Sequence, residues 1–463
     1  MRVKRSISSL LIVATVACSN MAWANSFNNA THLPIPPTSS EQRIMSDREN
    51  NLNIAMVGSA SSSNKSQQDY DDSSKILEKY LQEGKLANGE SALSAALEKA
   101  PGNDNTRFSL GIIQFLRAVE CLCQDLYHFG LRDMKAFGLN LPILHLPVGE
   151  NPNPATFAYE DARNMMDRFR QNLLKSEATL AGIKDANVKV PVQFGLIRMD
   201  LNGDGKADES ETLWKVYAHI TRGRGISETE QPKPFPIHFD RGDVHWLRGY
   251  CHLLSTICEV YLAYDSRESF ECGAHIFFKK VKTPYKFLAE GKRVHKFRDD
   301  MDLADIIAMI HLIRWQVVEP KRMEEALHHL EAVIAQSKES WKWIMLETDD
   351  DYEWLPNPRQ TGVMPGMKVT DEMVKSWLDM MSEMELILQG KVLAPFWRGE
   401  PGSQGINVRK VFMQPGPLDV VMWVQGPAAA PYLERGTITK SDVWNNLITV
   451  FGSDFPGFAI WFN

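Results

Sequence analysis

Residues 200–211 read DLNGDGKADESE, and they constrain the fold more than any other stretch of the chain. Oxygen-bearing side chains stand at the first, third, fifth, ninth and twelfth places, and glycine stands at the sixth. A hard cation such as Ca²⁺ takes about six to eight oxygen ligands, and a short segment supplies them only by wrapping around the ion. Gly205 allows the positive φ that such a tight turn needs. The spacing therefore predicts a closed loop around a divalent cation.

The expected ligands are five side chains and one backbone carbonyl. They are Asp200, Asn202, Asp204, Asp208 and Glu211 through side-chain oxygens, and Lys206 through its carbonyl. This pattern resembles the EF-hand calcium loop and matches it at every ligand place. The resemblance implies Ca²⁺ as the cofactor, with Glu211 closing the shell through both carboxylate oxygens.

The flanks of the loop indicate which kind of EF-hand it resembles. Before the loop, Pro191 and Gly195 break any long incoming helix. After it, apolar residues recur at helical spacing, namely Leu213, Trp214, Tyr217 and Ile220. The calcium loops of β-propeller repeats run into a strand instead, and an ordinary solvated turn is the other alternative. The resemblance is closest to the solitary extracellular or dockerin-like variety, which implies a structural clamp rather than a switch.

The amino terminus has the features of a secretory signal. Arg2, Lys4 and Arg5 precede an apolar run at 10–17, and Ala22-Trp23-Ala24 gives a small-x-small cleavage site. We expect a signal peptide at residues 1–24 and a periplasmic or secreted protein. Cys18 leaves lipidation open as an alternative.

Size and charge exclude some classes of protein. The chain has 463 residues, of which 44% are hydrophobic, so it is long enough to bury a sizeable core. Its net charge of −7 disfavours nucleic acid as a partner. No later apolar run approaches the length of a membrane span, so we expect no transmembrane segment after signal removal.

The pattern along the chain divides it into regions. Residues 25–72 are polar and predict a flexible leader, residues 73–390 a helical body containing the loop, and residues 391–463 a small α+β region. The fold class expected is mainly α, with helical hairpins around one core. The clearest predicted helices are 159–180, 240–264, 302–318, 321–346, 370–388 and 441–451, with strands at 406–413 and 418–424. Asn105 or Thr106 is the expected cap of a long helix that follows Pro101.

Residues 89–111 resemble part of a tetratricopeptide repeat, because a helix pair breaks at Pro101-Gly102 and restarts near a small residue. No second copy occurs at the period of such arrays, and a plain helical hairpin is the alternative.

Other groupings carry weaker expectations. His245, His252 and Glu259 recur every seven residues, too far apart for one ion, and predict buried hydrogen-bonded histidines. His328-His329 is expected at the surface. Asp349, Asp350 and Asp351 suggest a cation patch or, more simply, a solvated loop. Five further cysteines are compatible with an interhelical disulfide or with buried thiols, namely Cys121, Cys123, Cys251, Cys258 and Cys272.

Two classes of function follow from these observations. The chain has no Gly-x-Ser-x-Gly, His-Glu-x-x-His or phosphate-binding glycine loop, which favours a non-catalytic binding or scaffold protein with calcium as a structural clamp. Its ligand would be an unknown protein or saccharide. The alternative is a calcium-stabilised cell-envelope hydrolase whose active site no motif reveals.

Overall fold

The computed structural model describes residues 63–132, 148–215, 236–290, 296–298, 301–363, 368–398 and 404–452, together with Phe455 and Ala459. The signal peptide and most of the leader that the sequence predicts lie outside these residues. Within them, no helix combines the length and hydropathy that a bilayer crossing requires.

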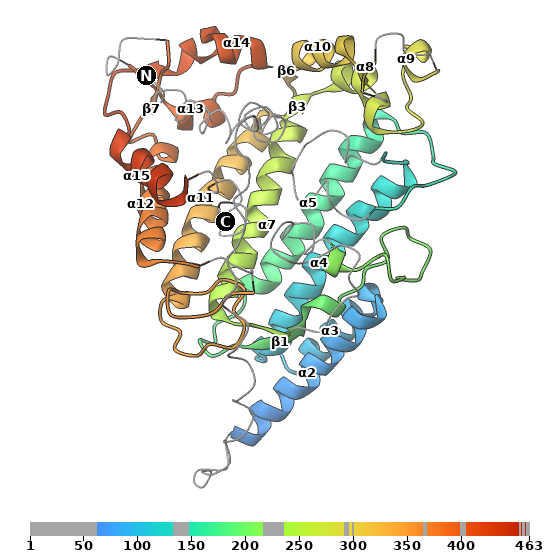
Figure 1. The fold of residues 1–463 in the computed structure, drawn as a ribbon, viewed down its shortest axis with the longest axis vertical. Helices are drawn as coiled ribbons and strands as arrows, with labels where there is room; N and C mark the ends of the chain where they lie inside the picture. Colours follow the sequence, from blue (N-terminus) through green and yellow to red (C-terminus); the bar gives the residue numbers. More distant parts are fainter. Residues whose placement is uncertain are drawn as a thin grey trace, which may run out of the picture.

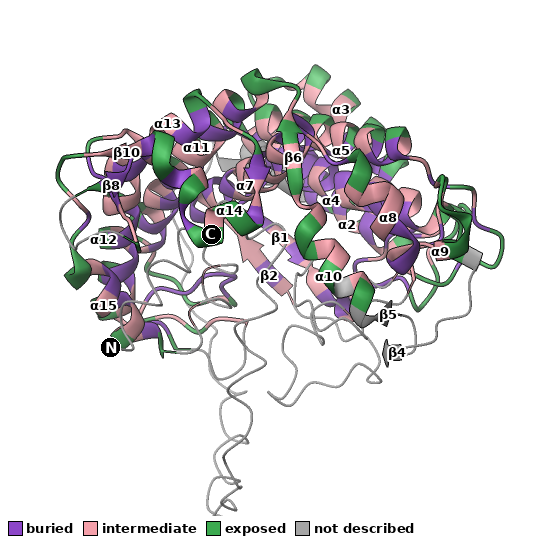
Figure 2. Ribbon diagram, turned by 90° about the horizontal axis from the view of Figure 1, so that it is seen from above, coloured by how far each residue is buried: buried purple, intermediate pink, exposed green. Residues whose placement is uncertain are grey.

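The described chain is mainly helical, as the sequence predicts. Its longer helices are α2 Ser63–Glu83, α3 Leu86–Lys99, α4 Asp104–His128, α5 Tyr159–Ala181, α7 Arg241–Ala263, α8 Arg267–Phe277, α10 Leu303–Leu312, α11 Pro320–Ile344, α12 Asp371–Leu388 and α15 Ser441–Phe451. Shorter helical turns are η3 Phe194–Leu196, α9 Lys286–Glu290, α13 Val408–Met413, α14 Val420–Gln425 and η4 Pro427–Tyr432. Helix α4 packs on α5, α5 on α7, α7 on α11 and α11 on α12, which gives a continuous row (Figure 1). Seen from above, the row curves into an arch (Figure 2).

Small antiparallel sheets fasten the ends of the helices. The strands are β1 Val190–Gln193, β2 Pro236–Phe239, β3 Tyr264–Asp265, β4 Lys296–Arg298, β5 Met301–Asp302, β6 Arg314–Val317, β7 Ala394–Pro395, β8 Gly405–Ile406, β9 Leu418–Asp419 and β10 Leu433–Glu434. They pair as β1-β2, β10-β8-β7, β3-β6-β9 and β4-β5. The β1-β2 pair connects the segment before the calcium-type loop to the segment that enters α7, with Val190 opposite Phe239.

The buried apolar side chains form two large clusters rather than the one core expected. The N-terminal core gathers side chains of α2, α3, α4 and β1, including Leu77, Leu93 and Ile113. The central core gathers side chains of α7, α11, α12 and α15, including Trp341 and Trp377. Each tryptophan is about 1% exposed or less, so each removes a large apolar surface from water.

Helix boundaries follow local capping chemistry. Asn103 caps α4 by accepting a hydrogen bond from Thr106 N at 2.9 Å, so the prediction of Asn105 or Thr106 as the cap is wrong by a few residues. Thr370 caps α12 as predicted and accepts from Met373 N. Helix α2 begins at Ser63, ten residues before the expected start at Ser73, because its first turns are polar and lack apolar periodicity.

Three predicted segments differ from the structure. The helix expected at 302–318 ends at Leu312 and continues as β6. The strands expected at 406–413 and 418–424 are mainly the helices α13 and α14. Short apolar runs do not distinguish strand from helix, and here Asn407 and Asp419 cap the helices by accepting hydrogen bonds from Lys410 N and Met422 N.

A buried ion-pair network joins three neighbouring helices of the arch. Glu259 on α7 is 2% exposed and lies 3.2 Å from Arg170 Nη1 on α5 and 2.9 Å from Arg322 Nη1 on α11. Arg322 also pairs with Glu319. Both arginines are largely shielded from water, so removing the shared carboxylate leaves their positive charges only partly neutralised.

We therefore expect Glu259→Ala to lower the free energy of unfolding by about 3 kcal/mol or more, because the variant leaves two largely buried arginines without their shared carboxylate. Urea denaturation measures the loss. Asp379→Ala is the matched control, since the Lys375–Asp379 pair is exposed and should contribute at most about 1 kcal/mol. Equal losses in the two variants would contradict a structural role for the network.

Candidate metal centre

The calcium-type loop at residues 200–211 is closed at its base by a short antiparallel bridge. Met199 N donates to Glu211 O at 3.0 Å and Leu213 N donates to Ile197 O at 3.1 Å. Arg198 and Thr212 face each other across this bridge. The entering segment is β1 followed by the turn η3, so the incoming helix of a full EF-hand is replaced by a strand and a tight turn, as Pro191 and Gly195 predict.

The first half of the loop is folded by side-chain oxygens that accept hydrogen bonds from its own backbone. Asp200 accepts from Gly203 N at 2.8 Å and from Gly205 N at 2.9 Å. Asp204 N donates to Asn202 Oδ1 at 2.8 Å. Gly203 and Gly205 have φ of +76° and +86°, the left-handed region that glycine adopts without strain. These contacts hold the first half of the loop in a series of tight turns.

The second half of the loop returns to its start through Glu211. Glu211 Oε1 accepts from Leu201 N at 3.0 Å and Asn202 N at 3.1 Å, while Oε2 accepts from Asp208 N at 3.0 Å. The residue is 4% exposed, and burial raises the pKa of its carboxyl. Hydrogen bonds from Ser210 lower the pKa of Asp208. Glu211 therefore spans the two ends of the loop, as the last place of the motif requires.

Helix α4 fixes the first residue of the loop from outside. Glu120 Oε1 accepts from Asp200 N at 3.0 Å, and Gln124 Nε2 donates to Asp200 O at 2.7 Å. Burial raises the pKa of Glu120 to about 6. Ala207 lies against Gly84 in the turn between α2 and α3, where a Cβ on the glycine would stand 2.1 Å from Ala207 Cβ. The loop is thus attached to the N-terminal helices on two sides.

The convergence of the six ligands on one ion stays a prediction. Lys206 is exposed, in agreement with an amine turned to solvent. The described residues contain a group of three acidic side chains whose ligand atoms all lie within 4.8 Å of one another, but that group is elsewhere and includes none of the loop carboxylates. The loop carboxylates instead hold backbone amides.

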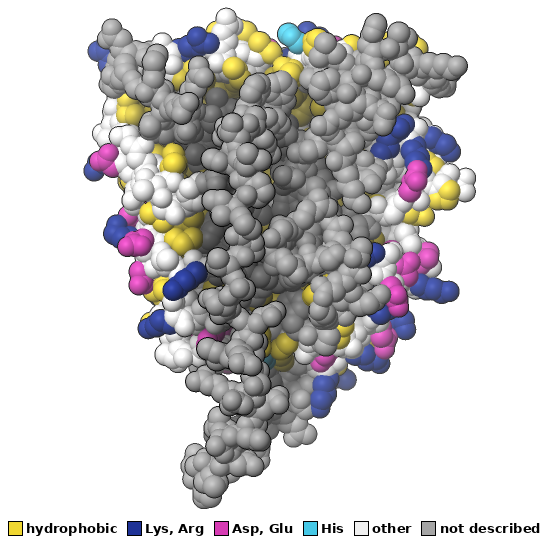
Figure 3. Space-filling model, viewed as in Figure 1, with side chains coloured by type: hydrophobic (Ala, Val, Ile, Leu, Met, Phe, Trp, Pro, Cys, Tyr) yellow, Lys and Arg dark blue, Asp and Glu magenta, His cyan; other side chains and the backbone are white. Residues whose placement is uncertain are grey.

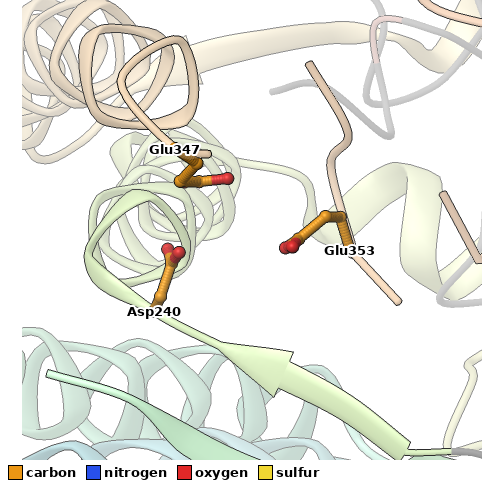
Figure 4. A group of neighbouring side chains, drawn as sticks. All are labelled: Asp240, Glu347 and Glu353. Atoms are coloured by element: carbon orange, nitrogen blue, oxygen red, sulfur yellow. The ribbon is translucent and has the colours of Figure 1, made fainter. Parts of the chain in front are cut away.

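That other group is the acidic cluster, formed by Asp240, Glu347 and Glu353. The three side chains come from different segments and point toward one another (Figure 4). Asp240 precedes α7, where it accepts from Gly242 N at 2.8 Å. Glu347 follows α11, and Glu353 lies in the next loop and is 3% exposed. Asp240 lies about a hundred residues before the other two, and the packing of α7 against α11 brings it to Glu347 and Glu353.

The surroundings of the acidic cluster are also acidic. Asp243 is 4% exposed and accepts from Asp240 N at 3.0 Å. The nearest cation is Lys189, which pairs with Asp349 at 2.6 Å and with Asp351 at 2.8 Å. Gln360 Nε2 donates to Glu347 Oε2 at 3.1 Å. One lysine does not balance this many carboxylates, so the cluster must hold protons or a cation.

The pKa values show the preference for protons. Burial, then the charges of Asp240 and Asp243, raises the pKa of Glu347 to about 10. Burial and the neighbouring Asp351 raise the pKa of Glu353 to about 8, and burial raises the pKa of Asp243 well above its usual range. The cluster therefore favours protonated over fully ionised carboxyls. A divalent cation that replaced the protons would have to lose its own hydration in the same buried site, which costs free energy.

The sequence does not predict this cluster. It predicts a helix at 240–264, which begins at Asp240, but Glu347 and Glu353 carry no local pattern. Asp349 and Asp351 were a candidate cation patch or a solvated loop, and the structure pairs both with Lys189, while Asp350 accepts from Thr361 N at 2.6 Å. The acidic cluster contains none of the three.

The histidine predictions are mostly confirmed. His245 is buried and its Nδ1 lies 2.8 Å from Gln336 Oε1. His252 Nδ1 lies 2.9 Å from His329 Nδ1, and His252 Nε2 lies 3.5 Å from Glu177. The side chain of His328 is 61% exposed, as predicted, but the surface prediction for its neighbour His329 is wrong because α11 turns that ring onto α7. Burial and then His252 lower the pKa of His329 to about 4.

No family model, no curated protein and no solved structure matches the chain.

The acidic cluster predicts a specific pH dependence of stability. Carboxyls with a raised pKa stabilise the folded chain most below the ordinary value near 4.5, and this stabilisation is lost as pH rises through about 8 and about 10. Glu353→Gln should therefore raise the melting temperature at pH 9 relative to the parent chain and change it little at pH 5. Thermal melts in chelator across this range test it. A variant that loses stability equally at both pH values would show that the carboxyl is not titrating.

Proposed function

We propose that the chain is an exported helical protein that binds one Ca²⁺ in the loop at residues 200–211, and that the ion is a structural clamp. The observation that carries this proposal is where the loop ends. Leu213 belongs to the N-terminal core and Trp214 to the central core, so consecutive residues enter different cores. An ion that fixes Glu211 against Asp200 would fix the junction between the two.

The ligand set would be the one that the spacing predicts. Asp200, Asn202, Asp204, Asp208 and Glu211 would bind through side chains and Lys206 through its carbonyl. Several hydrogen bonds within the loop support this ligand set. Asp200, Asn202 and Asp204 each accept a hydrogen bond from an amide a few residues ahead, and Glu211 reaches back across the loop. Rotation of these carboxylates toward the centre needs no change of backbone path.

Electrostatics gives the ion a role in stability. Four of the expected ligands are carboxylates within one twelve-residue loop, and two unit charges about 4 Å apart repel by about 4 kcal/mol at the effective dielectric of a protein surface. Without a cation, the loop depends on amide hydrogen bonds to offset this repulsion. A bound Ca²⁺ would neutralise half of the charge and tie the ligands together. The gain in stability follows the ratio of free ion to dissociation constant.

We further propose a non-catalytic role, binding a protein or saccharide partner, in the periplasm or outside the cell. Export rests on the sequence features of residues 1–24. A cavity of about 210 Å³ lies between α4 and α5, which is smaller than the roughly 300–1,000 Å³ of typical small-molecule sites. Asp125 and Arg168, which line it, form an ion pair at 2.8 Å. A hydrolase could use carboxylates that point toward one another, as those of the acidic cluster do. The carboxyls of this cluster are protonated or hydrogen-bonded, so no specific observation favours the hydrolase alternative.

Calorimetric titration of the mature chain with Ca²⁺ tests the proposal. We expect one site, a melting temperature that rises with free Ca²⁺, and about 2.7 kcal/mol of added stability when the ion is at about one hundred times its dissociation constant. Asp200→Ala and Glu211→Gln should abolish both the heat and the shift, because each removes a carboxylate from an end of the loop.

Two control variants identify the site. Asp185→Ala removes an acidic turn residue outside the loop, one that accepts from Asn187 N at 2.9 Å, and should bind Ca²⁺ like the parent. Glu353→Gln should also bind normally. Loss of the heat in Glu353→Gln, with Asp200→Ala unaffected, would assign the ion to the acidic cluster and refute the loop proposal.

A further inference from the structure

The upper edge of the molecule in Figure 1 exposes apolar side chains from three helices that are separate in the sequence. Helices α10 and α14 lie along this edge and α9 lies at its right-hand corner; α10 packs on both α8 and α14, and α9 packs on α8. Phe287 on α9 is 70% exposed, Ile307 on α10 is 51% exposed and Val424 on α14 is 56% exposed. In the view from above, exposed residues lie on all three helices (Figure 2). We call this surface the apolar end.

Helix α10 has too few polar residues for a solvent-exposed helix. Its sequence is LADIIAMIHL, and Ile307 and Ile310 are exposed one turn apart on one face. On α14, Val421 and Met422 are about two-fifths exposed. Large apolar side chains exposed on one side of a protein often mark a place where something binds.

The same end carries a concentration of positive charge. Residues 279–298 contain eight Lys or Arg and one Glu, in a chain whose net charge is −7. Of these, Lys280, Lys282 and Lys286 are described and exposed. None of these three lysines forms an ion pair with a carboxylate of the described residues. In Figure 3, which views the molecule as Figure 1 does, hydrophobic side chains lie along the upper edge, and the basic side chains visible there are mainly toward its left.

Two acidic side chains near this end are paired. Glu268 on α8 binds Arg314 at 2.9 Å, and Asp305 on α10 lies 3.5 Å from His275. Among the described residues, Lys280, Lys282 and Lys286 are therefore available to an anionic partner.

Position and residue type together indicate the partner. Lys286 stands between Tyr285 and Phe287, whose rings are 6.1 Å apart. Lysine is depleted in protein–protein interfaces, especially at their apolar centres. By contrast, aromatic and aliphatic residues with adjacent lysines are typical of surfaces that enter the headgroup region of an anionic bilayer, where a long lysine side chain can bury its stem and keep its charge among the phosphates.

We propose that the apolar end docks on the surface of a bilayer that contains anionic phospholipid. Phe287, Ile307, Ile310 and Val424 enter the headgroup boundary, and Lys280, Lys282 and Lys286 contact the lipid phosphates. The contact is peripheral and reversible, because it combines a modest apolar area with a few charges. It is independent of the calcium loop, which lies on α4 and the α2–α3 turn.

Co-sedimentation of the mature chain with vesicles tests the proposal. We expect strong binding to mixed phosphatidylglycerol–phosphatidylcholine vesicles at low salt, weak binding to phosphatidylcholine alone, and release as salt is raised. Each lysine near an anionic surface contributes about fivefold to the partition coefficient, so the triple variant Lys280→Gln, Lys282→Gln, Lys286→Gln should bind about a hundredfold more weakly. The double variant Lys342→Gln, Lys375→Gln changes exposed lysines of α11 and α12 and should bind like the parent.

The apolar contribution has its own matched pair of variants. Phe287→Ser should weaken binding about tenfold or more, in line with the loss of a buried aromatic side chain. Leu346→Ser removes a side chain that is 65% exposed beyond the end of α11 and should have no effect. Equal binding to neutral and anionic vesicles, or an unchanged partition coefficient in the triple variant, would overturn the proposal. So would a dimer in light scattering that Phe287→Ser dissociates, because the apolar end would then be covered by a second copy of this chain.

Discussion

The segment between Ile197 and Leu213 is closed on itself where the chain passes from the N-terminal core to the central core. The bridge at the base of the loop and the carboxylate of Glu211 hold its ends together, and α4 holds its first residue through Glu120 and Gln124. Leu213 packs in the N-terminal core, and the next residue, Trp214, packs in the central core. A loosened loop would therefore weaken the packing of both cores. In the proposed account, Ca²⁺ supplies the remaining rigidity.

The loop and the acidic cluster compensate the repulsion between neighbouring carboxylates in two different ways. Both bring carboxylates close together, which is unfavourable unless protons, amides or a cation compensate the charge. The loop uses backbone amides and leaves its carboxylates near the surface, where an ion can reach them. The cluster of Asp240, Glu347 and Glu353 is more enclosed and uses protons, so its pKa values rise. The contrast is the reason for placing Ca²⁺ in the loop.

The sequence predicts local structure here better than long-range structure. The turns of the loop follow from its Asp and Asn side chains, which accept hydrogen bonds from nearby backbone amides, and from its glycines, which allow tight turns. Helices α5, α7 and α12 follow from long apolar periodicity. The acidic cluster could not be predicted, because it depends on how α7 meets the end of α11. The helices α13 and α14 were mistaken for strands, since a six-residue apolar run has no period that separates the two. Whether the loop ligands share one ion is a question of side-chain rotation that the spacing suggests but does not determine.

A crystal structure of the mature chain grown with Ca²⁺ tests the central claim most directly. The account predicts one ion with oxygens of Asp200, Asn202, Asp204, Asp208 and Glu211 and the carbonyl of Lys206 at about 2.3–2.6 Å, and an unchanged backbone from Ile197 to Leu213. An empty loop whose carboxylates still hold the backbone amides, or an ion bound only between Asp240, Glu347 and Glu353, would contradict it.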